Sequence, residues 1–272
     1  MKADTEYIVF GHSHARYAIN DNYIPKLQNV AINAEPYFYT YQKVKHLVSH
    51  NKQVKTILVE FTNNQITKDM DNWIWGDIYL QRAYPFHAPL LNNEDQNILI
   101  THNFDGYLNA LSLSVKENLY IICKNEIKGN FGGYVSLGDS HADSIINKIK
   151  NNRNKFTLLP REISEINLKY LQKIEEFCDE NDIALFLIRS PQHPLSLERN
   201  NEKQFQKIRK KYFNDIVFLD FNNFPLENED FNDLEHVNSS GATKFSKWLR
   251  DIFEENRLLD KNILWENDTI SN

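Results

Sequence analysis

Cysteine is scarce in this chain, and it has no long apolar runs. Its 272 residues include two cysteines, Cys123 and Cys178, which lie far apart and in apolar segments. Buried free thiols have this pattern, whereas disulfide frameworks and zinc sites need more cysteines at characteristic spacings. No apolar run approaches the roughly 18 residues of a membrane-spanning helix. The sequence therefore predicts neither a cysteine-based metal site nor a membrane span.

An excess of positive charge is also missing. Lysine and arginine total 31 against 37 acidic residues, so the formal net charge is −6. Nucleic-acid-binding domains are usually basic, and we expect no nucleic-acid partner. The local basic run at 207–211 is interpreted as a solvated helix face. The chain has no glycine-rich phosphate loop, no dinucleotide fingerprint after a strand and no internal repeat, so no organic cofactor and no solenoid are expected.

The first apolar segment begins within a few residues of Met1. This leaves no room for a signal peptide, so the sequence as printed predicts a cytoplasmic protein. If it is part of a longer, anchored protein, a cell-envelope location is expected instead. A chain of this length with 41% apolar residues fits one large domain. We expect that domain at 1–256, with an irregular insertion at about 66–160 and a polar tail at 257–272.

A short apolar run followed by glycine forms the first motif. Tyr7 to Phe10 predict a buried strand, Gly11 permits a sharp turn, and Ser13 stands where a helix could begin. Ligands bind at this edge of open α/β sheets, and a helix N-terminus offers N–H groups to an oxyanion. Ser13 is thus a candidate nucleophile. The alternative is that it only caps the helix, a position that serine favours.

The second motif lies near the other end of the chain. Asp233 precedes His236 by three residues in a segment that leads into a predicted helix. At this spacing the carboxylate can hold one imidazole nitrogen while the other faces outward as a general base. The fold would have to bring this pair to Ser13.

Taken together, the two motifs resemble those of the SGNH hydrolase superfamily, also called GDSL-like esterases. That superfamily carries its serine in a Gly-x-Ser turn after the first strand and an Asp-x-x-His near its C-terminus. The Gly-x-Ser-His start at 11–14 and the Asp-x-x-His-x-Asn-x-x-Gly-Ala ending at 233–242 are most similar to its branch associated with bacterial surface polysaccharides. The resemblance spans about residues 5–253.

Membership of that superfamily would imply a catalytic triad of Ser13, His236 and Asp233. It would also imply three donors in an oxyanion hole: the backbone N–H of Ser13, a backbone N–H near Ala34, and the side-chain amide of Asn63. The superfamily usually has glycine at the second position and Gly-x-Asn-Asp around the third, and both are absent here. An ordinary turn stabilised by asparagine side chains is the alternative for the third block.

Three further residues follow predicted strands and are candidates to line a pocket: Asn33, Asn64 and His193. Aromatic residues in the insertion could stack against sugar rings, or could form a satellite hydrophobic cluster. His12 is expected to face solvent, and His14 to contact neighbouring loops. A metal centre of the Gly-His-x-His type would need ligands upstream that this chain lacks, so we expect no metal.

A second Gly-Asp-Ser-His sequence, at 138–141, spells the superfamily start more closely than the first. No continuous apolar strand precedes it, and the interval between Ser140 and Asp233 is too short for the strands and helices that must intervene. Ser140 is therefore assigned to a loop or helix cap.

Strands alternate with helices along the chain, which predicts a three-layer α/β/α sandwich with a mainly parallel, flavodoxin-like sheet. The expected strands are 7–10, 29–36, 54–61, 183–188 and 216–220. The main expected helices are 14–23, 37–50 and 165–181. Two more are expected: one that ends near 211, and one that Ser239 or Ser240 caps and that ends near 253.

We expect a serine-dependent ester hydrolase or O-acyltransferase that acts on acyl groups, acetyl above all, of a carbohydrate or polysaccharide. The alternative is an inactive SGNH-like protein that binds a glycan or assists polysaccharide assembly. Both expectations make a small molecule or glycan the partner.

Overall fold

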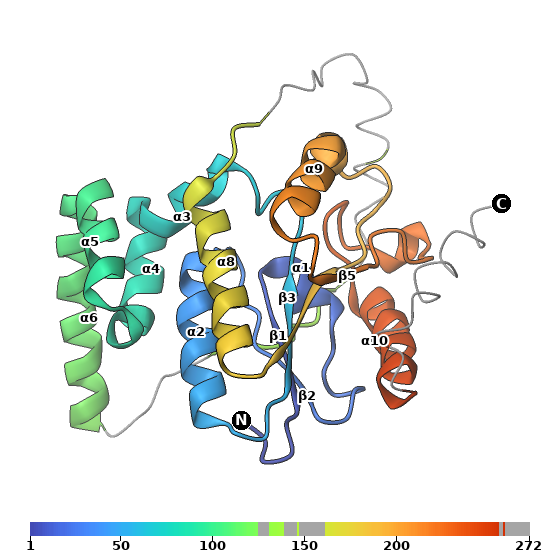
Figure 1. Ribbon diagram of the computed structural model, residues 1–272, viewed down its shortest axis with the longest axis horizontal. Helices are drawn as coiled ribbons and strands as arrows, with labels where there is room; N and C mark the ends of the chain where they lie inside the picture. The colour runs from blue at the N-terminus through green and yellow to red at the C-terminus, as the bar shows by residue number, and fades with distance from the viewer. Residues whose placement is uncertain (125–130, 139–145, 147–160, 256–257, 259–272) are drawn as a thin grey trace.

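The computed structural model describes residues 1–124, 131–138, 146, 161–255 and 258 (Figure 1). Its centre is a sheet of five parallel strands in the order β2-β1-β3-β4-β5. This is the flavodoxin-like order that the alternating sequence pattern predicted. The strands are β1 (Tyr7–Phe10), β2 (Leu27–Asn29), β3 (Thr56–Glu60), β4 (Ala184–Arg189) and β5 (Val217–Asp220).

Helices cover both faces of the sheet, which makes the fold a three-layer α/β/α sandwich. On one face lie α2 (Tyr37–His50), α8 (Glu165–Glu180) and α9 (Glu202–Tyr212); on the other lie α1 (Ser13–Ala18) and α10 (Ser239–Glu254) (Figure 1).

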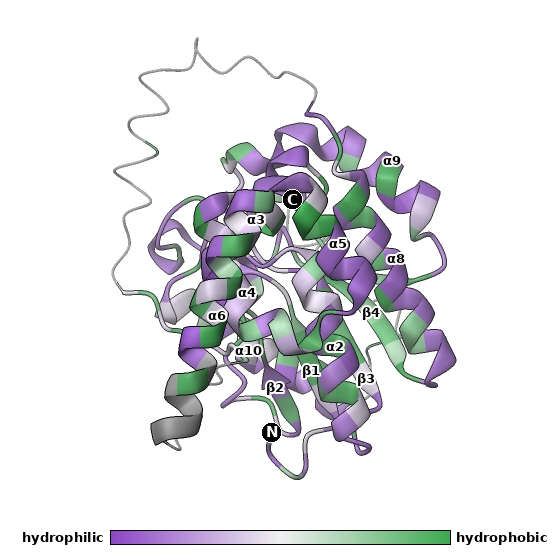
Figure 2. Ribbon diagram, turned by 90° about the vertical axis from the view of Figure 1, so that its left-hand side faces the viewer, coloured by the Kyte–Doolittle hydropathy of each residue, from purple (hydrophilic) through white to green (hydrophobic). Residues whose placement is uncertain are grey.

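Alternate residues of the central strands face these two layers. Ile57 and Val59 pack in the cluster with α2 and α8, whereas Leu58 packs in the cluster with α10. Strands buried on both faces are continuously apolar rather than alternating. The continuous apolar runs make these strands recognisable in the sequence. Figure 2 shows the apolar colour of the central strands.

The segment expected to be irregular is helical over residues 68–124. It forms two 3-10 turns, η1 (Lys68–Met70) and η2 (Ala88–Leu90), and the helices α3 (Asp71–Trp75), α4 (Asp77–His87), α5 (Asn93–His102) and α6 (Phe104–Lys124), which stand beyond α2 (Figure 1). Two local features favour helices in this segment. Asn92 and Asp95 form a reciprocal capping box that starts α5, and Pro85 lies inside α4 without ending that helix.

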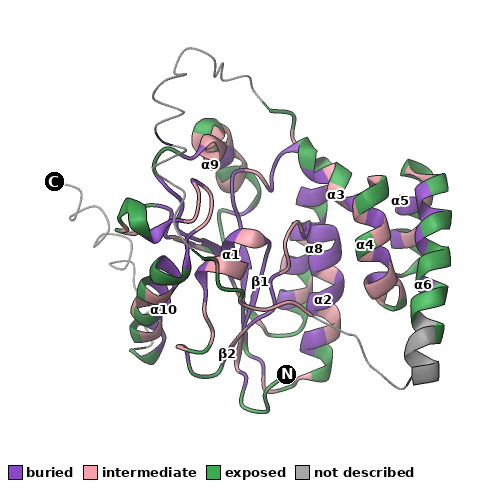
Figure 3. Cartoon of the chain, turned by 180° about the vertical axis from the view of Figure 1, so that it is seen from behind, coloured by how far each residue is buried: buried purple, intermediate pink, exposed green. Residues whose placement is uncertain are grey.

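Exposed residues run along much of the outer side of α6 (Figure 3), including Phe104 and Val115. Within the described residues, no helix combines the length and apolar character needed to cross a lipid bilayer.

Three element boundaries differ from those expected. Helix α1 ends at Ala18, because Asn20 turns back and accepts a hydrogen bond from the N–H of Asn22. The second strand ends at Asn29, where it was expected to begin. The N-cap of α10 is Asn238 rather than a serine, since its side chain accepts from the next helical N–H groups. The Asn256–Asn272 tail, apart from Leu258, and most of residues 139–160 lie outside the described residues.

Candidate active site

The turn after β1 brings Ser13 to the carboxyl edge of the sheet. Gly11 has φ +156°, and a Cβ there would lie 2.6 Å from the Cβ of Glu60 on the neighbouring strand. Only glycine fits this close approach of two strands. Because β2 lies on one side of β1 and the next strand, β3, lies on the other, Ser13 stands at the topological switch point, where ligands bind in sheets of this order.

Glu60 caps α1 from the end of β3. Its carboxyl oxygens accept hydrogen bonds from the N–H of Ala15 and, at 3.1 Å, from the N–H of Ser190. Burial raises the pKa of Glu60 to about 8, although both N–H groups act in the opposite direction. No sequence motif indicates this contact, because it joins three segments that are remote along the chain.

Ser13, His236 and Asp233 form a continuous hydrogen-bonded chain. Ser13 Oγ lies 2.9 Å from His236 Nε2, and both carboxyl oxygens of Asp233 lie 3.0 Å from His236 Nδ1. The carboxylate also accepts the N–H groups of Glu235 and His236 at 2.8 Å. With Asp233 accepting from Nδ1–H, the lone pair of Nε2 faces the serine hydroxyl.

Asp233 is held in its charged form. Burial alone would raise the pKa of this carboxyl group, but the hydrogen bond and charge of His236, with the N–H of Glu235, bring it below its ordinary value. The His236 side chain remains 22% exposed, so a substrate can reach it from solvent.

His12 is fully buried, so the expectation that it faces solvent was wrong. The hydroxyl of Thr62 donates to Asn64 at 2.6 Å and lies 2.9 Å from His12 Nε2, so it accepts the proton on that nitrogen. The lone pair of Nδ1 is then directed towards Ser13 Oγ, at 3.4 Å. Burial lowers the pKa of His12 to about 3, and nearby His236 adds to the effect, so this ring is neutral beside the serine.

Tyr17 belongs to the same site, although no sequence motif marks it. Its ring meets that of His236 edge-on at 5.2 Å, and its hydroxyl accepts a hydrogen bond from the amide of Asn33. It thus links the histidine to the loop after β2.

That loop holds Ala34 with φ +62°, in the left-handed region that glycine favours. The glycine that the resembled superfamily usually has here would adopt this conformation without strain. This chain places an alanine in the same conformation. Within the described residues, no hydrogen-bond acceptor is found for the backbone N–H of Ala34 or of Ser13. Ser13 begins α1, and the first N–H groups of a helix have no partner inside it.

A cavity of about 270 Å³ opens beside this loop. Its lining includes Asn33 and Ala34 from the loop, Arg82, and the aromatic side chains of Tyr39, Trp73, Tyr79 and Phe86. Asn33, one of the three predicted pocket residues, is part of this lining. Three of the four aromatic residues come from α3 and α4, that is, from the insertion.

Asn63 does not supply the free amide that the expected oxyanion hole requires. Its Nδ2 donates to Asn201 at 3.2 Å and to Glu202 at 2.9 Å, so both amide hydrogens are used. Its Oδ1 accepts from Arg189, whose guanidinium is also bound by Asp220. The side chain belongs to an ionic cluster around the buried guanidinium of Arg189, which joins the segment after β3 to β4, β5 and α9.

The other two pocket candidates also have local partners. Asn64 donates to Glu198 at 2.9 Å. His193 accepts from the N–H of Leu195 at 3.1 Å through Nδ1, and its Nε2 lies 3.0 Å from Asn228 Oδ1. Both ring nitrogens of His193 are therefore occupied away from Ser13. Ser140 lies outside the described residues.

A family model that carries no functional description matches residues 139–258, less than half of the chain and without Ser13. A protein of Leptospira interrogans serogroup Icterohaemorrhagiae serovar Lai (strain 56601), described as "Uncharacterized protein", is 24% identical over 144 residues. That match covers 52% of this chain but only 25% of the relative, so the chain spans about a quarter of the relative's length.

Among solved structures, the chain is similar to a GDSL-like lipase from Bacteroides thetaiotaomicron VPI-5482. The match covers 94% of this chain and 91% of the lipase at 9% sequence identity, with a TM-score of 0.38. Similarity at this level carries no functional argument. A function is therefore inferred from the side chains around Ser13.

Proposed function

We propose that this chain is a serine-dependent ester hydrolase or O-acyltransferase. The observation that carries the proposal is the chain of contacts from Ser13 Oγ to His236 Nε2, at 2.9 Å, and from His236 Nδ1 to Asp233, at 3.0 Å. A serine hydroxyl is a weak nucleophile until a base takes its proton, and a carboxylate behind the base fixes the required tautomer.

In the first half-reaction, Ser13 Oγ attacks the acyl carbonyl carbon while its proton moves to His236 Nε2. The carbonyl oxygen becomes an oxyanion, which the N–H groups of Ser13 and Ala34 stabilise, and Asp233 stabilises the imidazolium. When the tetrahedral intermediate collapses, the ester C–O bond breaks and His236 gives its proton to the leaving alkoxide. An acyl-serine remains.

In the second half-reaction, an acceptor hydroxyl loses its proton to His236 and attacks the acyl-serine. Collapse of this intermediate releases the acyl product and returns the proton to Ser13. Water as acceptor gives hydrolysis, and a sugar hydroxyl gives transfer. Both outcomes use the same three side chains.

The aromatic cavity supports an acylated carbohydrate as the substrate. Aromatic faces pack against the C–H faces of sugar rings, and the loop that offers the Ala34 N–H forms part of the same wall. We propose that a small acyl group such as acetyl enters at Ser13 while the sugar occupies the space between Trp73, Tyr79 and Phe86.

Acetyl-group analysis tests this function. The chain is incubated with p-nitrophenyl acetate and with an O-acetylated oligosaccharide, with and without an unmodified oligosaccharide acceptor. Free acetate and acetylated acceptor are measured by mass spectrometry. Turnover that Ser13→Ala abolishes, and that Ser49→Ala on the exposed side of α2 leaves intact, supports the proposal. Turnover that survives Ser13→Ala contradicts it.

A further inference from the structure

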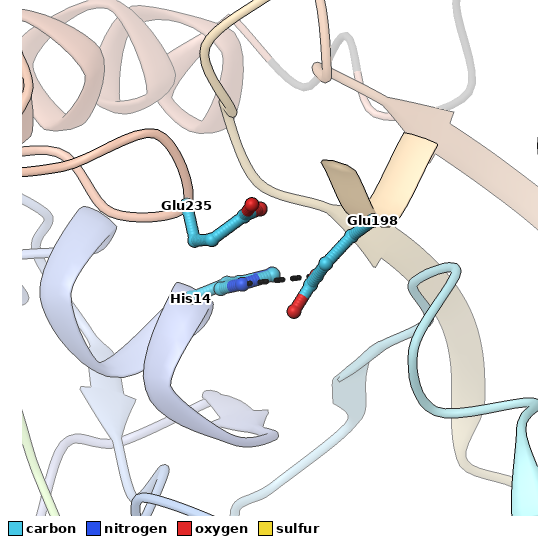
Figure 4. A group of neighbouring side chains, drawn as sticks. All are labelled: His14, Glu198 and Glu235. Carbon is cyan, nitrogen blue, oxygen red and sulfur yellow. Dashed lines mark ion pairs between the residues drawn. The ribbon is translucent and has the colours of Figure 1, made fainter. Parts of the chain in front are cut away.

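Three side chains that commonly bind metals converge beside the triad without belonging to it. His14 comes from α1, Glu235 from the loop that carries His236, and Glu198 from the 3-10 helix η4 (Leu197–Asn201). One ligand atom of each lies within 4.8 Å of the others. Figure 4 shows the His14 ring close to both carboxyl groups, with its contact to Glu198 at 3.5 Å.

Gln192 extends the end of its side chain into the same group. Its Nε2 lies 3.0 Å from Glu198 Oε2, 3.2 Å from Glu235 Oε2, and 3.4 and 3.5 Å from the two ring nitrogens of His14. Gln192 is only 1% exposed, yet its Oε1 has no hydrogen-bond partner within the described residues. A buried carbonyl oxygen without a partner is unusual and needs an explanation. Rotation of the amide would turn this oxygen towards the centre of the group.

The carboxyl groups of Glu198 and Glu235 lie close together. In the part of the chain that the structure describes, neither Glu198 nor Glu235 forms an ion pair with a lysine or an arginine. The imidazole of His14 has a ring nitrogen that can serve as a metal ligand.

We propose that His14, Glu198 and Glu235 bind one divalent transition-metal cation, with Gln192 Oε1 as a fourth ligand. One imidazole nitrogen with carboxylate and amide oxygens suits Zn²⁺ or Mn²⁺ better than Ca²⁺, which takes oxygen ligands alone. Donor atoms at about 2.0–2.2 Å from one ion lie roughly 3–4 Å apart, so shifts of about 1 Å close the group.

Access and position agree with this site. The side chain of Glu198 is 20% exposed, which gives an ion a route from solvent. The cation would join α1, η4 and the loop of residues 233–236, and so hold the segments that carry Ser13 and His236. The site stands whether or not Ser13 is a nucleophile.

Equilibrium dialysis against ZnCl₂ and, separately, MnCl₂ tests the proposal without any activity assay. The full chain is first treated with EDTA, and bound metal is measured by inductively coupled plasma mass spectrometry. We expect one ion per chain, and a Kd at least tenfold higher in both Glu198→Gln and Glu235→Gln. Circular dichroism and thermal melting establish that each variant is folded.

A matched control removes the other histidine pair that could capture zinc. His46 and His50 lie one turn apart on α2, with ring centroids 4.4 Å apart, and His50 is exposed. We expect His46→Gln to leave the stoichiometry unchanged. If zinc binding is lost only in His46→Gln, or if both glutamate variants bind zinc as well as the wild type does, the zinc is an adventitious ion only. Either result overturns the proposal. Absence of binding overturns it equally.

Gln192→Glu provides a gain-of-function test that does not depend on a loss. It places a third carboxylate among the existing donors, so we expect a lower Kd for Zn²⁺ and a larger rise of Tm on adding the metal than in the wild type. If the group is only a hydrogen-bonded pair of acids, the same substitution lowers Tm and added metal does not restore it.

Discussion

Ser13 Oγ and His236 Nε2 lie 2.9 Å apart although 223 residues separate them along the chain. The sheet accounts for this proximity, because Ser13 follows β1 while His236 follows the edge strand β5, and parallel strands end at one side of the sheet. Asp233 lies on the far side of the imidazole. The arrangement leads directly to the first prediction.

Asp233→Asn should lower kcat by about 10²–10⁴-fold while the chain stays folded. The amide preserves the shape of the carboxylate but cannot accept Nδ1–H and stabilise the imidazolium in the same way. Steady-state kinetics with p-nitrophenyl acetate measure the effect. Asp251→Asn, on the exposed side of α10, serves as the control and should keep wild-type kcat. Equal rates in the two variants would remove Asp233 from the mechanism.

Stability should depend on pH through Glu60. Its pKa of about 8 in the fold lies above the ordinary value of 4.5. Between these two values the folded state binds more protons than the unfolded state, so this group's contribution is greatest below pH 4.5 and is lost as the pH rises through 8. The slope is at most about 1.4 kcal/mol per pH unit.

Urea unfolding of wild type and Glu60→Gln at pH 5 to 8 measures that contribution. The variant should show a flatter dependence of unfolding free energy on pH. Glu162→Gln is the control, because the Lys68 ion pair lowers the pKa of exposed Glu162 and it does not titrate in this range. A slope that Glu60→Gln leaves unchanged would contradict the assignment of the protonated carboxyl group.

Ala34→Gly should leave the free energy of unfolding unchanged or raise it by up to about 1 kcal/mol. A left-handed backbone costs an alanine about 1–2 kcal/mol, which offsets the greater entropy of glycine in the unfolded chain. The same substitution at Ala83, inside helix α4, should cost roughly 0.5–1 kcal/mol. Chemical denaturation of both variants checks the sign. Equal losses would mean that Ala34 is not strained.

Arg189→Ala should destabilise the fold by about 1–3 kcal/mol. It removes a guanidinium that is 3% exposed and leaves Asp220 and Glu202, which are 28% and 38% exposed, without their shared partner. Arg250→Ala is the matched control, since Arg250 pairs with Asp251 on the surface and should change stability by less than about 1 kcal/mol. Similar effects of the two substitutions would contradict a buried ionic cluster.

Asn63→Ala separates stability from catalysis at the same cluster. Because the amide of Asn63 is bound by Glu202 and Asn201, we expect a loss of about 1–3 kcal/mol in stability and little change in kcat. A 10²-fold fall in kcat at unchanged stability would instead support the oxyanion role that the resemblance implied.

The sequence predicted the parallel α/β/α architecture and the triad candidates because both depend on local patterns. Continuous apolar runs mark strands that are buried on two faces, and the spacings around Ser13 and His236 need no knowledge of distant residues. The helical insertion was missed because clustered aromatic residues and an internal proline concealed its periodicity.

The remaining features depend on contacts between distant segments. Glu60 faces α1 only once β1 and β3 pair, and the hydroxyl of Thr62, which meets buried His12, comes from the segment after β3. Asn63 was assigned from its place after a strand, but the guanidinium of Arg189 on the next strand decides where its side chain points. None of these partners is close in sequence.

Intact-protein mass after exposure to a fluorophosphonate probe is the most direct test of the proposed function. Such a probe phosphonylates a serine that a neighbouring base activates. We predict a single adduct on the wild type and on Ser140→Ala, and no adduct on Ser13→Ala. An adduct that persists in Ser13→Ala and disappears in Ser140→Ala would contradict the account, because the activated serine would then lie at the second Gly-Asp-Ser-His sequence.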